Sequence, residues 1–141
     1  MIDRDTYLHL QNVIRREGRS FLQYAGESFP WNTYEEKEKA AQLNEIVREE
    51  RDGAAALSRY LIKHRLTPPY LGAYPSYFTS YNYLSLDRLL PLLVDHQKRG
   101  LADLQADVLA LHNGETRKQV EDILAMKGRH LKALEALAIC K

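Results

Sequence analysis

The sequence predicts an all-α protein: a four-helix bundle made of two antiparallel helical hairpins, with a long crossover between the second and third helices. One observation is that residues 5–25, 33–64, 86–112 and 116–139 each carry one apolar stripe at three-and-four spacing. Another is the length of the links, which are short after the first and third helices and long at residues 65–84. An open helical array with a tyrosine-rich lid is the alternative. We favour a bundle because each helix has one stripe and not two.

Length and composition limit the classes of protein. The 141 residues, 45% hydrophobic and 28% charged, are expected to form one globular domain over residues 1–141. A net charge of +1 gives no reason to expect a nucleic acid or a membrane as partner. The N-terminus lacks an apolar signal core, so we expect a cytoplasmic protein. The single cysteine, Cys140, excludes an internal disulfide and a multi-cysteine metal site.

The first helix, residues 5–25, is predicted to end at Gly26. Its stripe includes Ile14 and Phe21, and Glu17 lies between them at a stripe position. In the connection that follows, we expect residues 29–31 (Phe-Pro-Trp) to plug one end of the core.

The second helix, residues 33–64, begins at a capping Thr33 followed by an acidic first turn. Glu50 falls on its apolar side, whereas Glu45 and Glu49 are expected to be solvated. Gly53 is its one glycine.

The crossover, residues 65–84, holds three of the five prolines and five of the nine tyrosines. Its early prolines exclude one continuous helix, and Pro75 is expected to open a short helix through Tyr81. We expect the tyrosines to pack against the bundle. A subunit interface or a ligand patch is the alternative role.

The third helix, residues 86–112, is expected to be capped by Ser85 or Asp87, and Gln97 is the one polar interruption of its stripe. Asn113-Gly114 predicts a tight reversal into the fourth helix, residues 116–139. In that helix, Lys127 and His130 stand within the apolar stripe.

The five interruptions lie near the middle of their helices, so we expect them at one level of the bundle. They are Glu17, Glu50, Gln97, Lys127 and His130. A buried charge needs a partner, and one ammonium between two carboxylates satisfies all three groups. The alternative is that Lys127 extends along the core to reach water. The other four histidines are expected to be solvated.

These positions resemble those of the ferritin-like di-iron proteins, rubrerythrin in particular. That family carries a glutamate on the first and third helices and Glu-x-x-His on the second and fourth, and it has one long crossover. Here Glu17 and Glu50 match glutamates, while Gly53 replaces a histidine. Gln97, or Val94 in another register, replaces the third-helix glutamate. Residues 127–130 (Lys-Gly-Arg-His) stand in place of the last Glu-x-x-His.

The resemblance implies a degenerate di-iron site. We expect no cofactor, because Lys127 would replace the metal by bridging Glu17 and Glu50. The alternative is a residual iron site on Glu17, Glu50 and His130.

Three functions follow. We expect a non-catalytic interaction or structural protein that forms a homodimer. The first alternative is an iron-binding oxidoreductase or storage protein of rubrerythrin type with a reduced site. The second is a binder of a small anionic ligand in the bundle core, near Lys127 and His130.

Overall fold

The computed structural model describes residues 2–28, 33–82, 84–112 and 114–139, and it confirms the all-α class. The plug predicted at residues 29–31 lies outside the described residues. Within the described ranges, no helix is both long and apolar enough to cross a membrane. The α-helices are α1 (Arg4–Gly18), α2 (Phe21–Ser28), α3 (Lys37–Lys63), α4 (Leu86–Ala110) and α5 (Gly114–Ile139), and two 3₁₀ helices are η1 (Tyr34–Glu36) and η2 (Ser76–Tyr81).

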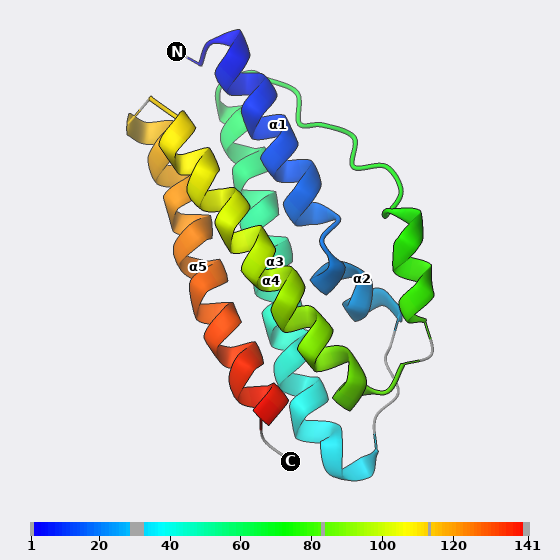
Figure 1. Cartoon of the computed structure of the whole chain (residues 1–141). Helices are drawn as coiled ribbons and strands as arrows, with labels where there is room; N and C mark the ends of the chain where they lie inside the picture. Colours follow the sequence, from blue (N-terminus) through cyan, green and yellow to red (C-terminus); the bar gives the residue numbers. More distant parts are fainter. Residues whose placement is uncertain (1, 29–32, 83, 113, 140–141) are drawn as a thin grey trace.

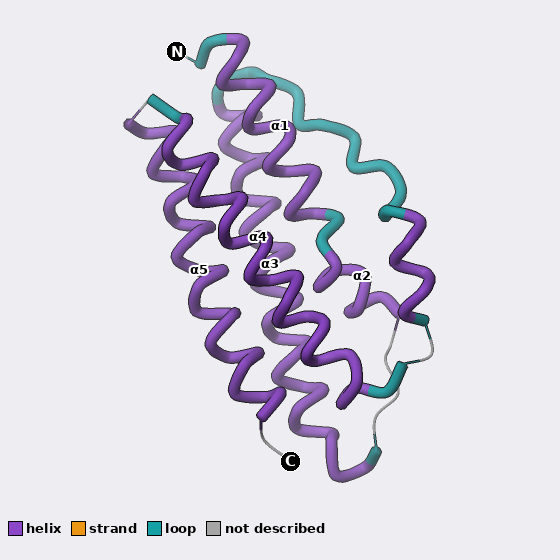
Figure 2. Tube along the Cα trace, viewed as in Figure 1, coloured by secondary structure: helices purple, strands orange, loops and turns teal. Residues whose placement is uncertain are grey.

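The helices pack as two antiparallel hairpins joined by the crossover (Figure 1). The chain descends through α1 and α2, returns along α3, and descends again through the crossover on the outside of the bundle (Figure 2). Helices α3 and α4 therefore run parallel, and α5 runs antiparallel to α4. Helix α4 packs on α5, α1 packs on α3, and α3 also packs on α5, so the hairpins share one core.

The single first helix predicted for residues 5–25 is wrong, because the chain breaks between α1 and α2. Arg19 leaves helical geometry with φ −124° and ψ 32°. The Ser20 hydroxyl then accepts a hydrogen bond from the backbone N–H of Gln23 (3.2 Å), which satisfies a donor in the first turn of α2. At Gly18 an added Cβ would lie 3.0 Å from a methyl group of Leu71, so the crossover packs closely against the end of α1.

The predicted stop at Gly26 is also wrong, because α2 continues to Ser28. A Cβ on Gly26 would lie 2.6 Å from Cγ1 of Val47 on α3. Gly26 therefore permits a close approach of two helices instead of ending one.

Several predicted helix boundaries are confirmed. Ser85 caps α4 by accepting a hydrogen bond from the Arg88 amide. The Glu36 carboxylate accepts one from the Thr33 amide, which is half of a capping box. Pro75 precedes η2, the short helix expected through Tyr81.

The core consists of two apolar clusters separated by a polar level. The cluster nearer the N-terminus, called here the N-end cluster, is Leu10, Val13, Ile14, Leu57, Tyr60, Leu61, Leu104, Val108, Leu111, Val120, Ile123 and Met126. The cluster nearer the C-terminus, called the C-end cluster, is Phe21, Leu22, Ala25, Leu43, Ile46, Val47, Phe78, Leu86, Leu89, Leu90, Leu93, Val94, Leu134 and Leu137. In sequence, Glu17 falls between Ile14 of the first cluster and Phe21 of the second. Four buried polar residues of the other helices also fall between the two clusters: Glu50, Gln97, Lys127 and His130.

Candidate functional site

Lys127 lies between two buried carboxylates at the polar level. Its Nζ is 3.0 Å from Oε1 of Glu17 on α1 and 3.2 Å from Oε2 of Glu50 on α3. All three residues are at most 2% exposed. The two contacts expected for Lys127 from the sequence are therefore present, and they tie α5 to both α1 and α3. We call Glu17, Glu50 and Lys127 the charged triad.

Polar groups of α2 complete the hydrogen bonding of Glu50. Oε1 of Glu50 accepts hydrogen bonds from the Ser20 hydroxyl and from Nε2 of Gln23 (3.1 Å). Gln23 also donates to the Val47 carbonyl at 2.8 Å. The break before α2 thus positions Ser20 against a buried carboxylate. Sequence reasoning missed both residues, although glycine followed by serine at 18–20 is a recognisable stop and cap.

Arg16 is a second cation beside the triad. Its Nε is 3.7 Å from Oε2 of Glu17, and its Nη2 donates to Asp107 on α4. Asp107 also contacts Nε2 of His9 at 2.7 Å. The side chain of Arg16 therefore links α1 to α4 at the level of the triad.

Burial sets the protonation of the triad. Burial raises the pKa of Glu17, and the charge of Glu50 adds to that rise against the attraction of Lys127. Burial alone would lower the pKa of Lys127, but the carboxylates of Glu50 and Glu17 raise it above its ordinary value. Lys127 is thus a stable ammonium, and Glu17 takes up a proton at a higher pH than an ordinary glutamate does.

His130 and Gln97 lie near the triad without bonding to it. Nε2 of His130 is 3.4 Å from Oε2 of Glu49, whose side chain is 55% exposed. Burial lowers the pKa of His130 more than Glu49 raises it, so the ring is neutral at pH 7. Gln97 is 3% exposed, and its Nε2 has no hydrogen-bond partner among the described residues. Val94, the alternative third-helix position, belongs to the C-end cluster.

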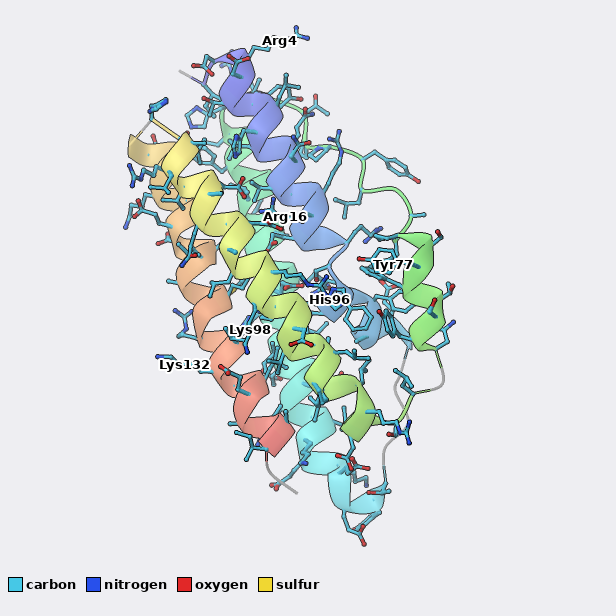
Figure 3. All side chains as sticks on the ribbon, in the orientation of Figure 1. Arg4, Arg16, Tyr77, His96, Lys98 and Lys132 are labelled. Carbon is cyan, nitrogen blue, oxygen red and sulfur yellow. The ribbon has the colours of Figure 1, made fainter. Side chains whose placement is uncertain are left out.

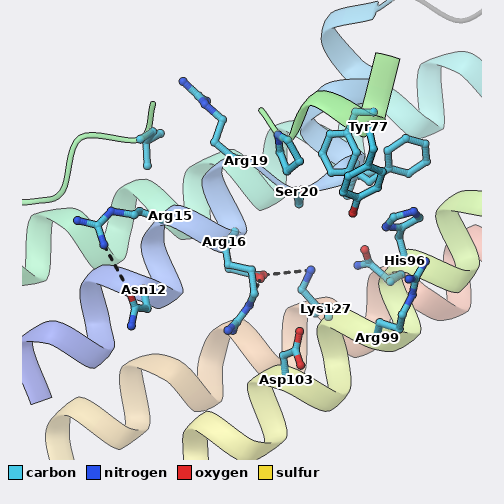
Figure 4. Close-up of a pocket in the computed structure, with 18 of the residues that line it drawn as sticks. Asn12, Arg15, Arg16, Arg19, Ser20, Tyr77, His96, Arg99, Asp103 and Lys127 are labelled. Carbon is cyan, nitrogen blue, oxygen red and sulfur yellow. Dashed lines mark hydrogen bonds and ion pairs between the residues drawn. The ribbon is translucent and has the colours of Figure 1, made fainter. Parts of the chain in front are cut away.

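A cavity of about 590 Å³ opens beside Lys127 and is enclosed by α1, the start of α2, the crossover and α4 (Figure 4). Gln97 lines it and His130 does not. Gly100 on α4 makes room for the ammonium, because a Cβ there would lie 3.3 Å from Nζ of Lys127. The charged residues that line the cavity are Arg15, Arg16, Arg19, Arg99, Lys127, Glu17 and Asp103.

Three of these arginines, Arg15, Arg19 and Arg99, form no ion pair among the described residues. Arg15 donates to the amide oxygen of Asn12, and Arg19 donates to the carbonyls of Gly72 and Gly18. Arg19 also lies over the Tyr74 ring, 4.8 Å from its centroid. The cavity rim therefore carries an excess of positive charge, with five cations in the lining against the carboxylates of Glu17 and Asp103.

The expectation that the other histidines are solvated is wrong for His64, whose Nε2 is buried and whose ring centroid lies 4.6 Å from that of Tyr60. It is also wrong for His96, which is half-buried. Its ring centroid lies 4.3 Å from that of Phe21 and 6.0 Å from that of Phe78. Burial lowers its pKa, and Arg99 lowers it further. The helical periodicity of the sequence could not predict the burial of His96. One of the rings that cover it, Phe78, comes from η2 in the crossover and not from a bundle helix.

The donor set suits a cation poorly. Among the described residues, no three histidine, cysteine, aspartate or glutamate side chains are grouped so that they could hold a metal ion. Gly53, at the expected histidine position, faces Met126.

The chain matches no family model, no curated protein and no solved structure. The resemblance to ferritin-like proteins accordingly stays a prediction.

Proposed function

We propose that this chain is a non-catalytic protein that acts by binding a small anionic molecule in the cavity beside Lys127. One observation carries the proposal: the cavity lining has five cations against two carboxylates, and it includes the buried Gln97, whose Nε2 has no hydrogen-bond partner among the described residues. Its volume of about 590 Å³ suits a small molecule. An anion would neutralise the rim and could accept a hydrogen bond from Gln97.

We further propose that Lys127 replaces the metal of a ferritin-like ancestor. The ammonium lies between Glu17 and Glu50, the two residues that match metal-binding glutamates in the resemblance. A metal ion at that position would have to displace Lys127 and then face its charge. Glycine at position 53 and glutamine at position 97 supply neither an imidazole nor a carboxylate.

These residues do not fit a di-iron centre, so we favour ligand binding over an iron-dependent oxidoreductase or a storage protein. A residual site on Glu17, Glu50 and His130 is also disfavoured. Nε2 of His130 is directed to Glu49, while Glu50 is hydrogen bonded to Ser20 and Gln23. A homodimer and a cytoplasmic location stay predictions.

Calorimetric titration with acetate, inorganic phosphate and 2-naphthoate tests the binding function. We expect at least one of these anions to bind with a stoichiometry of one. Arg99→Gln should weaken that binding about tenfold, because a hydrogen bond to a charged group contributes about 1.5–3 kcal/mol. Lys98→Gln is the matched control: it removes the same charge from the adjacent position, and Lys98 does not line the cavity. Figure 3 shows Lys98 and His96 on opposite sides of α4.

Two outcomes would contradict the proposal. One is that none of the three anions binds. The other is that Arg99→Gln and Lys98→Gln weaken binding equally, since this would indicate a general effect of net charge and no site in the cavity.

A further inference from the structure

One wall of the cavity is aromatic, and the proposed binding of an anion does not account for it. Phe21, Tyr77, Phe78 and His96 all line the cavity. The ring centroids of Tyr77 and Phe78 are 4.8 Å apart, and those of Phe21 and Phe78 are 5.2 Å apart. The rings come from α2, η2 and α4, so they are assembled by the fold and not by one helix.

The aromatic wall and the cationic residues line the same space, and they meet at Arg99. Figure 4 shows Arg99 beside His96 and below Tyr77, while Arg15 and Arg16 lie on the opposite side of the cavity. Tyr77 is 54% exposed, although its ring contacts Phe78. A ligand that entered beside Tyr77 would cover apolar ring surface that now faces water.

Gln97, which follows His96 in sequence, is a further polar residue of the lining. It is 3% exposed and lines the cavity, and its Nε2 has no hydrogen-bond partner among the described residues. A buried donor without an acceptor is unfavourable, so a ligand acceptor that the Gln97 side chain turned to meet would be favoured.

We infer that the cavity selects an aromatic carboxylate, with the ring system against Tyr77 and Phe78 and the carboxylate towards Gln97 and the arginines. This inference rests on the proposed binding function and specifies its ligand class. A flat ring packs well against other rings, and a planar carboxylate matches the guanidinium fork. Asp103, at the same rim, would repel the second negative charge of a phosphate monoester.

Three probes separate the two parts of the ligand. 2-Naphthoate has the ring system and the charge, acetate has only the charge, and 2-naphthol has only the ring system at neutral pH. We expect 2-naphthoate to bind at least about tenfold more tightly than either of the others, because it alone combines ring packing with a charged hydrogen bond. Calorimetry on the full chain gives the three dissociation constants.

A pair of tyrosine variants tests the wall directly. Tyr77→Ala should weaken 2-naphthoate binding about fivefold and leave acetate binding unchanged, since it removes one exposed ring of the wall. Tyr70→Ala is the control, because Tyr70 is 90% exposed and does not line the cavity. It should leave both constants unchanged.

The outcomes distinguish this inference from the proposed function. If acetate or phosphate binds as tightly as 2-naphthoate, the aromatic specificity is wrong and the anion site stands. Equal weakening by the two tyrosine variants would also overturn the aromatic wall. If 2-naphthol binds as tightly as 2-naphthoate, or no probe binds, the anion-binding function itself is wrong.

Discussion

Lys127 shows how a charge can be stable inside an apolar helix stripe. Removing an ammonium from water is costly, and two carboxylates within 3.2 Å offset that cost. The pKa of Lys127 is raised above its ordinary value of 10.5 by these carboxylates despite the opposing effect of burial. The stability that the raised pKa of Lys127 contributes is therefore present at neutral pH and is lost in strongly alkaline solution, while protonation of Glu17, whose pKa is also raised, removes its ion pair in acid.

Replacing Lys127 by methionine should destabilise the fold by about 3–5 kcal/mol at pH 7, because two buried carboxylates lose their partner. The loss should shrink by about 1–3 kcal/mol at pH 5. Burial already raises the pKa of Glu17, and without the ammonium that pKa rises further. The folded variant then takes up a proton that the unfolded chain does not, so acidification stabilises it. Urea unfolding followed by circular dichroism at both pH values measures the difference.

Lys132→Met is the control, since Lys132 is an exposed lysine on the same helix. It should change the free energy of unfolding by less than about 0.5 kcal/mol. A Lys127→Met protein as stable as the wild type at pH 7 would show that the ion pairs contribute little. A loss that does not depend on pH would show that packing of the side chain, and not its charge, is what the core requires.

At the scale of the elements, amphipathic periodicity predicted α3, α4 and α5 to within a few residues at either end. It failed at α1 and α2 because Ile14, Glu17 and Phe21 keep helical spacing across the break. The break depends on contacts that only the fold creates: the Ser20 hydroxyl meets Glu50 on α3, and Leu71 of the crossover packs over Gly18. Periodicity describes one helix at a time and cannot report such contacts.

Two helical glycines should respond in opposite directions to alanine. Gly26→Ala should cost about 1–3 kcal/mol, because its Cβ would lie 2.6 Å from the stiff, β-branched side chain of Val47. Gly128→Ala should gain about 0.5–1 kcal/mol, because a Cβ there meets no described atom within 4 Å and alanine favours the helix. Chemical denaturation gives both values. A neutral Gly26→Ala would mean that α2 shifts easily on α3.

For the whole molecule, the polar level was predictable and the cavity was not. The apolar stripe of each helix identifies its buried face. The charged residues within the stripes, Glu17, Glu50 and Lys127, therefore predicted a layer of buried charge across the bundle. The cavity needs Tyr77 and Phe78, whose positions depend on how the crossover folds over the bundle. The proline-rich crossover has no periodicity from which this could be derived. The resulting molecule has two apolar clusters held in register by the charged triad between them.

Lys127 lies between Glu17 and Glu50, so the proposed replacement of metal by this lysine predicts a fold that does not depend on metal. The purified protein should contain well under one equivalent of iron, manganese or zinc by elemental analysis, and a chelator should leave its melting temperature unchanged. Lys127→Glu adds a carboxylate and removes the ammonium, so it should increase the uptake of manganese or iron relative to the wild type. Lys132→Glu, which makes the same charge change on the surface of α5, should not. Stoichiometric metal in the wild type whose removal lowers the melting temperature would contradict the replacement of metal by Lys127 and would favour an iron-binding protein.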